Sequence, residues 1–440
     1  MAIAPGSVFW DGSKFVLYYS ASNSTDTSLG NTGKPGFGLA TSPNSITWTK
    51  QGEVFSNGTD YNQRANENCG SIGSLHSQAY FRFPDVMKIG GTYYMWYSRA
   101  FAIRLATSND GVNWTVQNGG CAVLFSADWN DPSPPPNQAP VHGYVWDGDW
   151  VSYPSVFYDP VAKNFKMFYS GCDIDCTIVR TGFATSTDGV AWTKYVGNSV
   201  LSPTPGGFDN SDWTADGAAL LVNGTIMMYY SADTASSLMC REGYSGDSAC
   251  SNNEGFTATG IGLASISEVP LNQGWNLVSV PVVPSNNAIT SVLAPQIAAN
   301  DFTAVWSYQG GKWIYATLSN GKLSGSLKTI QDGLGYWIYM TTADTLLVGG
   351  TVIPPASAPP SYSLSAGWNL VGFKPQPVMV SKPVGQFLKS ISGSYDPSTV
   401  WAWDNYAESW IEASADTPLI PGQAFWIYVT ASAGATLRPS

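Results

Sequence analysis

The sequence predicts an all-β protein, and three features support that prediction. An aromatic YYxS stretch, an alternating ATS stretch and an SxDGxxW turn occur several times in the same order. These stretches alternate apolar and polar residues with the period of a half-buried strand, and helical periodicity is absent. The composition is rich in glycine and aromatic residues with only 12% charged residues, which is typical of secreted all-β proteins.

Four copies of this sequence repeat divide the first part of the chain into units of four predicted strands each. The copies are clearest at residues 80–125, with YYMWYS and IRLATSNDGVNWT, and at 151–202, with FKMFYS and TGFATSTDGVAWT. Residues 3–55 and 213–266 carry FVLYYS with GFGLATS and IMMYYS with GIGLASI. Tight glycine turns join successive strands into antiparallel meanders. Such units in series predict the blades of a β-propeller.

Two of these stretches resemble a known superfamily. They are PDVMKIGGTYYMWYS with IRLATSNDGVNWT, and YPSVFYDPVAKNFKMFYS with TGFATSTDGVAWTKY, and they resemble the five-bladed β-propeller glycosidases. That superfamily includes the arabinan- and xylan-cleaving family 43 enzymes and the family 130 phosphorylases. The resemblance covers residues 1–268. It implies a propeller of the five-bladed type, of which four blades are visible in the sequence, and a carbohydrate substrate.

A glycosidase of this kind needs two carboxyl groups that flank the sugar, and the innermost strand of each blade lines the central channel. Asp85 is the first candidate, because it stands on such a strand where two other blades have Ser7 and Ser155. Arg82 is close enough in sequence that we expect it to keep Asp85 ionised, as suits a base or nucleophile. The predicted catalytic carboxyl groups are Asp85, Asp149, Asp212 and Asp216.

Two observations leave a structural interpretation open. An aspartate next to glycine and tryptophan often only caps a turn. Family 43 enzymes use a glutamate acid on an inner strand, and none of the visible blades has one there. On the basis of the resemblance, the chain is predicted to be a glycoside hydrolase acting on a plant or microbial polysaccharide. The alternative is a non-catalytic glycan-binding or cell-surface structural protein on the same scaffold. No cofactor or metal site is predicted in either case.

The longest connections are all of the two kinds that emerge on one face of a propeller: residues 21–36, 56–80, 122–150, 171–180 and 232–259. Long loops on a rigid scaffold are where binding sites usually lie. Sugar rings stack on indole, so tryptophans of this face suit a glycan ligand. The predicted substrate-binding residues are Arg82, Trp129, His142, Trp146, Trp150 and Trp213.

Five of the six cysteines lie in those long connections, and Cys121 directly precedes the connection 122–150. An even number of cysteines in loop-like surroundings predicts disulfides and an oxidising compartment, so we expect a secreted, extracellular protein. The predicted pairs are Cys172–Cys176, Cys240–Cys250 and, by elimination, Cys69–Cys121. A net charge of −11 argues against nucleic acid as a partner. No apolar run is long enough to span a membrane.

A different repeat begins after residue 268. LNQGWNLVSVPV recurs as LSAGWNLVGFKPQ, and GLGYWIYMT recurs as GQAFWIYVT. These copies predict two small β modules, residues 269–350 and 363–440, joined by the proline-rich stretch 351–362. AITSVLAPQI and PVGQFLKSI are each expected to form a short helix.

The two modules are similar to the GWNL-type repeats of secreted microbial surface proteins. No titratable cluster lies in them, so binding or attachment to the cell surface or cell wall is a better prediction for them than catalysis. We expect the tryptophans at matching positions of the two copies to lie in the module cores. These are Trp275, Trp337, Trp368 and Trp426.

Overall fold

The computed structural model shows an all-β chain, as the sequence predicts. The chain forms two compact units: one comprises residues 1–219 and 229–262, the other residues 220–228 and 263–440. The predicted boundary at residue 268 falls within a strand, so independent folding of the two halves stays a prediction. The structure describes residues 2–22, 35–56, 81–99, 102–126, 146–148, 150–160, 162–173, 178–195, 198–203, 214–222, 225–232, 260–284, 286–351, 361–374 and 381–438.

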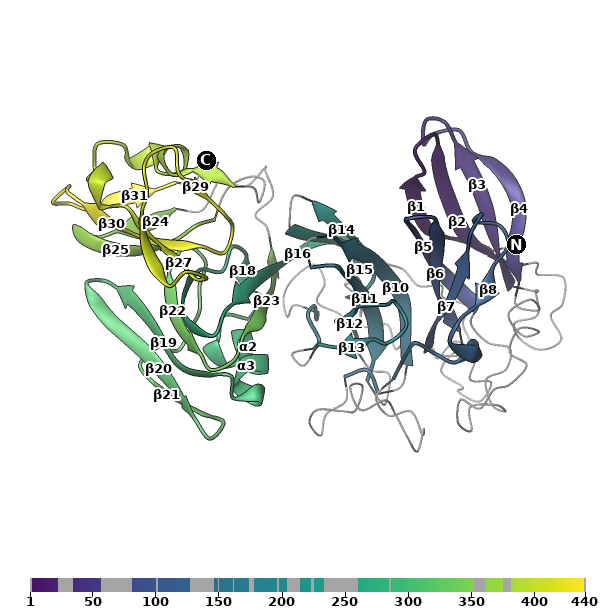
Figure 1. Ribbon diagram of the computed structural model, residues 1–440, viewed down its shortest axis with the longest axis horizontal. Helices are drawn as coiled ribbons and strands as arrows, with labels where there is room; N and C mark the ends of the chain where they lie inside the picture. Colours follow the sequence, from purple (N-terminus) through teal and green to yellow (C-terminus); the bar gives the residue numbers. More distant parts are fainter. Residues whose placement is uncertain are drawn as a thin grey trace. The chain divides into compact units, whose positions relative to one another are not determined.

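Three four-stranded antiparallel meanders lie in the first unit (Figure 1). They correspond to the blades predicted at residues 3–55, 80–125 and 151–202. The first consists of β1 (Ala2–Trp10), β2 (Phe15–Ser22), β3 (Pro35–Ser42) and β4 (Thr49–Ser56). The second consists of β5 (Phe81–Ile89), β6 (Thr92–Arg99), β7 (Ala102–Ser108) and β8 (Thr115–Val116), with β9 (Leu124–Phe125) paired to β7 after the 3-10 helix η1 (Asn118–Gly120). The third consists of β10 (Trp150–Asp159), β11 (Asn164–Cys172), β12 (Val179–Ser186) and β13 (Thr193–Lys194).

The fourth predicted blade contributes three strands, β14 (Thr214–Val222), β15 (Thr225–Ala232) and β16 (Gly260–Leu271). They belong to a sheet in which the next neighbours are β23 (Asp344–Thr351) and β18 (Val283–Pro284), in the order β14-β15-β16-β23-β18. β16 pairs with β23 from Ser265 onward. A strand from far along the chain therefore stands where the other blades have their own fourth strand.

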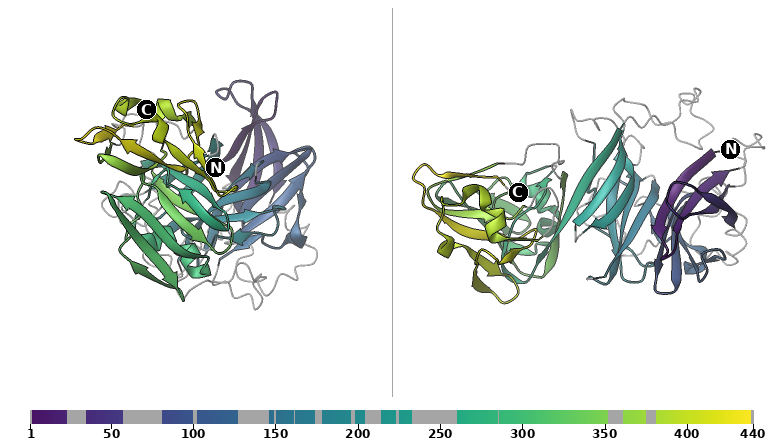
Figure 2. Two further views of the ribbon diagram at one scale, coloured as in Figure 1. Left: turned by 60° about the vertical axis from the view of Figure 1, so that its left-hand side comes forward. Right: turned by 90° about the horizontal axis from the view of Figure 1, so that it is seen from above.

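Side chains are buried on both faces of the β5–β8 sheet. Figure 2 shows the ribbon of the chain from two further directions. Along β6, Met95 and Tyr97 belong to a core shared with Tyr18 of β2, whereas Trp96 belongs to a core shared with Phe165 of β11. Met95, Trp96 and Tyr97 are all fully buried. This two-sided burial explains why YYMWYS is a nearly continuous apolar run instead of a simple alternation.

The serine of the YYxS stretch links one blade to the next. The backbone N–H of Phe83 on β5 donates to Ser20 Oγ at 2.9 Å, and the N–H of Tyr153 on β10 donates to Ser98 Oγ at 3.0 Å. Phe83 and Tyr153 lie at register shifts and have left-handed backbone angles, with φ of 56° and 51°. The repeated serine therefore satisfies a backbone donor at a bulge in the neighbouring inner strand.

The SxDGxxW turn makes a second link of the same kind. The hydroxyl of Tyr18 donates to the carbonyl oxygen of Gly111 at 2.7 Å, and Trp96 Nε1 donates to that of Gly189 at 3.0 Å. Tyr18 and Trp96 occupy one position in their blades, and the two glycines occupy one position in the following turns. In the first two blades the repeated stretch thus bonds to the turn of the next blade. The third blade has Phe168 at this position, which carries no donor.

The second unit holds two modules of similar topology (Figure 1). The first contains β17 (Gly274–Val278), α2 (Ile289–Val292), α3 (Ala294–Ala299), β19 (Phe302–Gln309), β20 (Lys312–Ser319), β21 (Lys322–Gly325) and β22 (Tyr336–Met340). The second contains β24 (Tyr362–Leu364), β25 (Gly367–Gly372), β26 (Lys382–Pro383), α4 (Val384–Phe387), η3 (Lys389–Ile391), η4 (Pro397–Thr399), β27 (Trp401–Asp404), β28 (Ser409–Glu412), β29 (Pro418–Leu419), β30 (Ala424–Val429) and β31 (Ala435–Leu437). Their main sheets run β17-β22-β19-β20-β21 and β25-β30-β27-β28. Short helices lie where both copies predict them.

The two modules are related by an approximate two-fold axis. Each has its own hydrophobic core, and two backbone bridges join them, Val278 with Gln423 and Leu334 with Val371. In the aligned copies Val278 corresponds to Val371, and Leu334 corresponds to Gln423. The two bridges are therefore one contact made twice, which is the signature of a two-fold interface.

A buried ion pair also ties the modules together. Lys374 Nζ lies 2.8 Å from Asp332 Oδ2, and the hydroxyl of Tyr362 donates to the same oxygen at 2.7 Å. Lys374 is 1% exposed, and burial lowers the pKa of its ammonium group against the opposing effect of Asp332. Because Asp332 comes from the first module and its partners from the second, the pair fixes how the two pack.

Candidate functional site

Asp85 lies on β5 with its carboxyl group enclosed by protein, although the residue as a whole is half-buried. Oδ2 of this carboxyl group accepts a hydrogen bond from the backbone N–H of Val156 on β10, and the N–H of Val86 also bonds to it. Burial raises the pKa of Asp85 to about 7, and the two N–H groups oppose that rise. The expectation that Arg82 keeps Asp85 firmly ionised is wrong, because the loss of solvent outweighs other effects.

The equivalent positions of the other blades explain this arrangement. Ser7 Oγ accepts the backbone N–H of Val86 at 2.6 Å, and Ser155 Oγ accepts that of Ala219 at 2.9 Å. Asp85 occupies the same place, where a side chain of one inner strand accepts an N–H from the next. The described contacts thus give Asp85 a structural role between blades, and its catalytic role stays a prediction.

The structure describes three of the predicted substrate-binding residues, and two of them pack against other residues of the fold. Trp150 is 9% exposed and belongs to a core cluster with Val179. Trp146 is half-buried and lies over Gly182, where an added Cβ would be 2.5 Å from the indole ring. Arg82 is half-buried on β5. Sugar binding by these residues stays a prediction, and little of Trp150 is open to a ligand.

The other predictions for this face fall largely outside the described residues. Asp216 lies on β14, where its backbone alone is described. Cys121 and Cys172 are both disulfide-bonded, but four cysteines lie outside the described residues, so the predicted pairs stay predictions. Also outside are Trp129, His142, Asp149, Asp212, Trp213, Cys69, Cys176, Cys240 and Cys250.

Metal-site and membrane searches apply to the described part of the chain alone. Within it, no group of three or more His, Cys, Asp and Glu side chains is placed to hold a metal ion. In the same ranges, no helix has the length and hydrophobicity to cross a membrane.

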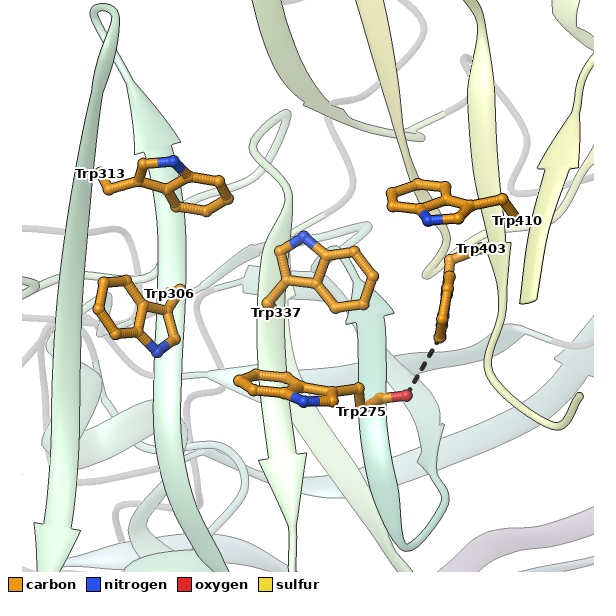
Figure 3. Close-up of a pocket in the computed structure, with 6 residues that line it drawn as sticks. All are labelled: Trp275, Trp306, Trp313, Trp337, Trp403 and Trp410. Atoms are coloured by element: carbon orange, nitrogen blue, oxygen red, sulfur yellow. Dashed lines mark hydrogen bonds between the residues drawn. The ribbon is translucent and has the colours of Figure 1, made fainter. Parts of the chain in front are cut away.

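A cleft lined by tryptophan lies in the second unit (Figure 3). Its volume is about 560 Å³, which is within the range of roughly 300–1,000 Å³ typical of ligand sites. No charged side chain of the described residues lines it. The lining residues are Trp275, Trp306, Trp313 and Trp337 of the first module and Trp403 and Trp410 of the second.

The sheet of the first module builds this cleft because one of its faces is aromatic. On β22, Ile338 points into the module core and is 1% exposed, whereas Trp337 and Tyr339 lie on the opposite face. The strand register places Trp275 opposite Tyr339 and Trp306 opposite Trp337, so the rings form adjacent rows. The face of an antiparallel sheet turned away from its core is usually polar. Tryptophan in its place indicates a surface that contacts something other than water.

The indole rings meet edge to face. Trp337 lies 6.1 Å from Trp275 at 87° and 5.2 Å from Trp403 at 70°. It also lies 5.7 Å from Trp410 at 75°. Trp403 Nε1 donates to the carbonyl oxygen of Trp275 at 3.2 Å and so holds a hairpin of the second module against the first. Figure 3 shows Trp337 between Trp275 and Trp410. Because these rings are nearly perpendicular, the cleft is lined by both ring faces and ring edges.

The prediction that Trp275 and Trp368 are core residues is wrong, because they are 37% and 42% exposed. Trp337 and Trp426 are half-buried and pack around a small cluster between the modules. A sequence signal for this arrangement exists. In YWIYM and FWIYV, the tryptophan and tyrosine flank a central isoleucine, and neighbours along a strand cannot share its face.

Comparisons with known proteins assign no family: no family model matches this chain, and no curated protein matches it. Solved structures similar to it include a glycoside hydrolase, 19% identical over 53% of this chain and 66% of that one, with a TM-score of 0.38. A structure from the GH130 family of mannoside phosphorylases is 19% identical over 60% of this chain and 66% of its own, with a TM-score of 0.38. A glycosyl hydrolase from Bacteroides ovatus is 16% identical over 78% and 86%, with a TM-score of 0.39. This chain spans just under two thirds of the length of the first two.

Proposed function

We propose that this chain binds a neutral polysaccharide and that the tryptophan cleft is the binding site. The observation that carries the proposal is the lining of six indole rings, without a charged side chain among the described residues. Sugar rings present apolar C–H faces that stack on indole. A charged ligand would lose hydration in such a cleft without gaining an opposite charge, so an uncharged polymer is favoured.

The tryptophans of the cleft are open to a ligand and yet held in place. Trp275, Trp313 and Trp410 are 37%, 47% and 48% exposed. Trp313 packs edge to face on Trp306, with ring centroids 6.3 Å apart at 81°. Rings that are oriented before binding lose little conformational freedom when the ligand arrives. Such preorganisation favours a binding site over a loosely packed surface.

Trp275→Ala tests the proposal. Wild type and variant are titrated with soluble arabinan, xylan and mannan, and binding is followed by intrinsic fluorescence and affinity electrophoresis. We expect the variant to bind about tenfold or more weakly, as is typical when a tryptophan that contributes strongly to a binding surface is replaced by alanine.

Trp10→Ala is the matched control for that titration. Trp10 is 52% exposed and packs edge to face on Phe15, with centroids 4.9 Å apart, but it lies on β1 in the first unit. The Trp10→Ala variant should therefore bind the polymers as tightly as wild type does. Wild-type protein that binds none of the polymers would disprove the proposal, and so would equal losses in both variants.

Hydrolysis of the polysaccharide is a second candidate function, and one observation favours it. Phe83 and Tyr153 have left-handed backbone angles on inner strands β5 and β10, and strained backbone of this kind concentrates at functional sites. The position that corresponds to them on β14 is Asp216. We propose Asp216 as one carboxyl group of a catalytic pair. Its predicted partners are Asp85, Asp149 and Asp212.

Release of reducing sugar from the same polymers tests this second candidate. Asp216→Asn should abolish release and leave polymer binding by the cleft unchanged, because the change conserves shape and lies outside the cleft. Asp85→Ser separates the two roles of Asp85, since Ser7 and Ser155 perform the same inter-blade bonding. Loss of release in this variant makes Asp85 the catalytic partner of Asp216, and full release makes it a structural residue only. A wild-type chain that binds a polymer and releases nothing is a binding protein.

An extracellular location belongs to the same proposal. Cys121 and Cys172 are disulfide-bonded, and such bonds persist in oxidising compartments. A polysaccharide of plant or microbial origin is met outside the cell. Attachment to a cell surface or cell wall through the C-terminal modules stays a prediction.

A further inference from the structure

The tryptophan cleft has a counterpart across the approximate two-fold axis of the second unit. The aligned stretches YWIYM and FWIYV make Trp337 correspond to Trp426. The hairpins VWSYQGGKW and VWAWDNYAESW have matching strand registers, so Trp313 corresponds to Trp410. The axis therefore exchanges Trp313 and Trp410. Both line the cleft, which is called the first half here, and both also belong to its counterpart across the axis, the second half.

Ring distances agree with this correspondence. Trp337 lies 5.7 Å from Trp410 at 75°, and its counterpart Trp426 lies 5.7 Å from Trp313 at 68°. Each central tryptophan thus rests on the hairpin of the opposite module. Two contacts so similar show that the aromatic faces of both modules are built to one plan.

The outer ends of the two halves also match. Trp275 meets Trp337 at 6.1 Å and 87°, and Trp368 meets Trp426 at 6.1 Å and 86°. Trp368 is 42% exposed and its strand neighbour Tyr428 is 39% exposed. The second half therefore presents an open aromatic surface, as the first half does.

We propose that the surface around Trp368, Trp401 and Trp426 is a second half-site, which continues the cleft and takes the same neutral polysaccharide. The inference rests on the proposed function of the cleft. Continuity supports it, because Trp313 contacts Trp306 of the cleft at 6.3 Å and Trp426 of the second half at 5.7 Å. A polymer that follows this row of rings covers both halves, and a short oligosaccharide fills either one.

The two halves differ chemically at the position of Tyr315 and its counterpart Glu412. In the first half Trp306 stacks on Tyr315, with centroids 4.8 Å apart at 29°. In the second half the register pairs Trp401 with Glu412, which is exposed. A carboxylate accepts strong hydrogen bonds from hydroxyl groups, whereas the tryptophan rings of the first half offer apolar faces. The second half should therefore depend on ligand hydroxyl groups more than the first.

Calorimetric titration with short and long oligosaccharides separates one half-site from two. The probes are xylobiose and xylohexaose, with the manno- and arabino-oligosaccharides of the same lengths. Wild type should bind two disaccharides per chain and one hexasaccharide. Trp368→Ala should lower the disaccharide stoichiometry to one and weaken hexasaccharide binding about tenfold or more, and Trp275→Ala should do the same.

Two further variants keep the test independent of misfolding. Trp368→Phe retains an aromatic ring and should lose less hexasaccharide affinity than Trp368→Ala, with an unchanged melting temperature. Glu412→Gln retains the size of the side chain and should weaken hexasaccharide binding roughly threefold to tenfold. Asp416→Asn changes an exposed carboxyl group outside β27 and β28 and should have no effect.

The outcomes distinguish this inference from the proposed function. If wild type binds no oligosaccharide or polymer, both fail. If wild type binds one disaccharide, Trp275→Ala abolishes that binding and Trp368→Ala does not alter it, the second half-site is refuted while the cleft stands. A stoichiometry of two that falls to one in each of the two variants supports the second half-site, and a stoichiometry that Trp368→Ala leaves at two refutes it.

Discussion

Replacing Asp85 by serine should reduce the pH dependence of stability. Burial raises the pKa of Asp85 from its ordinary 3.8 to about 7 in the folded protein. The folded chain therefore holds this proton more tightly than the unfolded chain. The resulting stabilisation is fully present below pH 3.8 and is lost as the pH rises through about 7.

The expected size follows from those two pKa values. This difference in pKa between the folded and unfolded chain corresponds to about 4 kcal/mol of unfolding free energy in total. About 2 to 3 kcal/mol of it is lost between pH 5 and pH 8. Serine at this position still accepts the N–H of Val156, as Ser7 and Ser155 accept theirs, but it has no proton to lose in this range. Asp85→Ser should therefore remove most of that loss.

Urea unfolding at pH 5, 6, 7 and 8 measures the effect, and amide exchange at Val156 reports the local contact. Asp110→Asn is the matched control, because the bonds from Asn113 and Val112 hold the pKa of Asp110 below its usual range and keep it ionised at all four pH values. The first blade has Asn44 at that position of the turn. Equal pH slopes for wild type and Asp85→Ser would refute the assignment of a buried, easily protonated carboxyl group.

Three other expectations concern packing, disulfides and binding. Gly182→Ala should lower the free energy of unfolding by roughly 1–3 kcal/mol in thermal or urea melts, because the added methyl group meets the ring of Trp146 at 2.5 Å. Gly91→Ala is the control and should leave the free energy of unfolding nearly unchanged, because no atom lies within 4 Å of an added Cβ there. Mass mapping without reduction should give the pairs Cys172–Cys176, Cys240–Cys250 and Cys69–Cys121, and any other pairing would contradict this prediction. Trp275→Ala should weaken polysaccharide binding about tenfold or more in the titrations described above, whereas Trp10→Ala should not.

Local repetition made the blades predictable. Strands of blades pair with their sequence neighbours, so YYMWYS and the turn after IRLATS carry enough information to place a meander. The alignment of Asp85 with Ser7 and Ser155 was also available from the repeat, and all three accept an inter-blade N–H in the structure. The pKa of Asp85 was not available, because it depends on how completely a neighbouring blade excludes water.

The tryptophans of the modules show where sequence reasoning ends. Alternation in YWIYM assigns Trp337 and Ile338 to opposite faces of a strand, but it does not say which face meets water and which meets a second module. That choice depends on contacts between residues far apart in the chain, such as Trp403 with Trp275. By itself the sequence determined the strands, the blade repeat and the duplication of the modules, because these follow from neighbours along the chain. Tertiary structure alone decided that Trp337 packs between modules, that Trp275 borders an open cleft and that Asp85 is enclosed, because solvent exclusion is a property of the assembled surfaces.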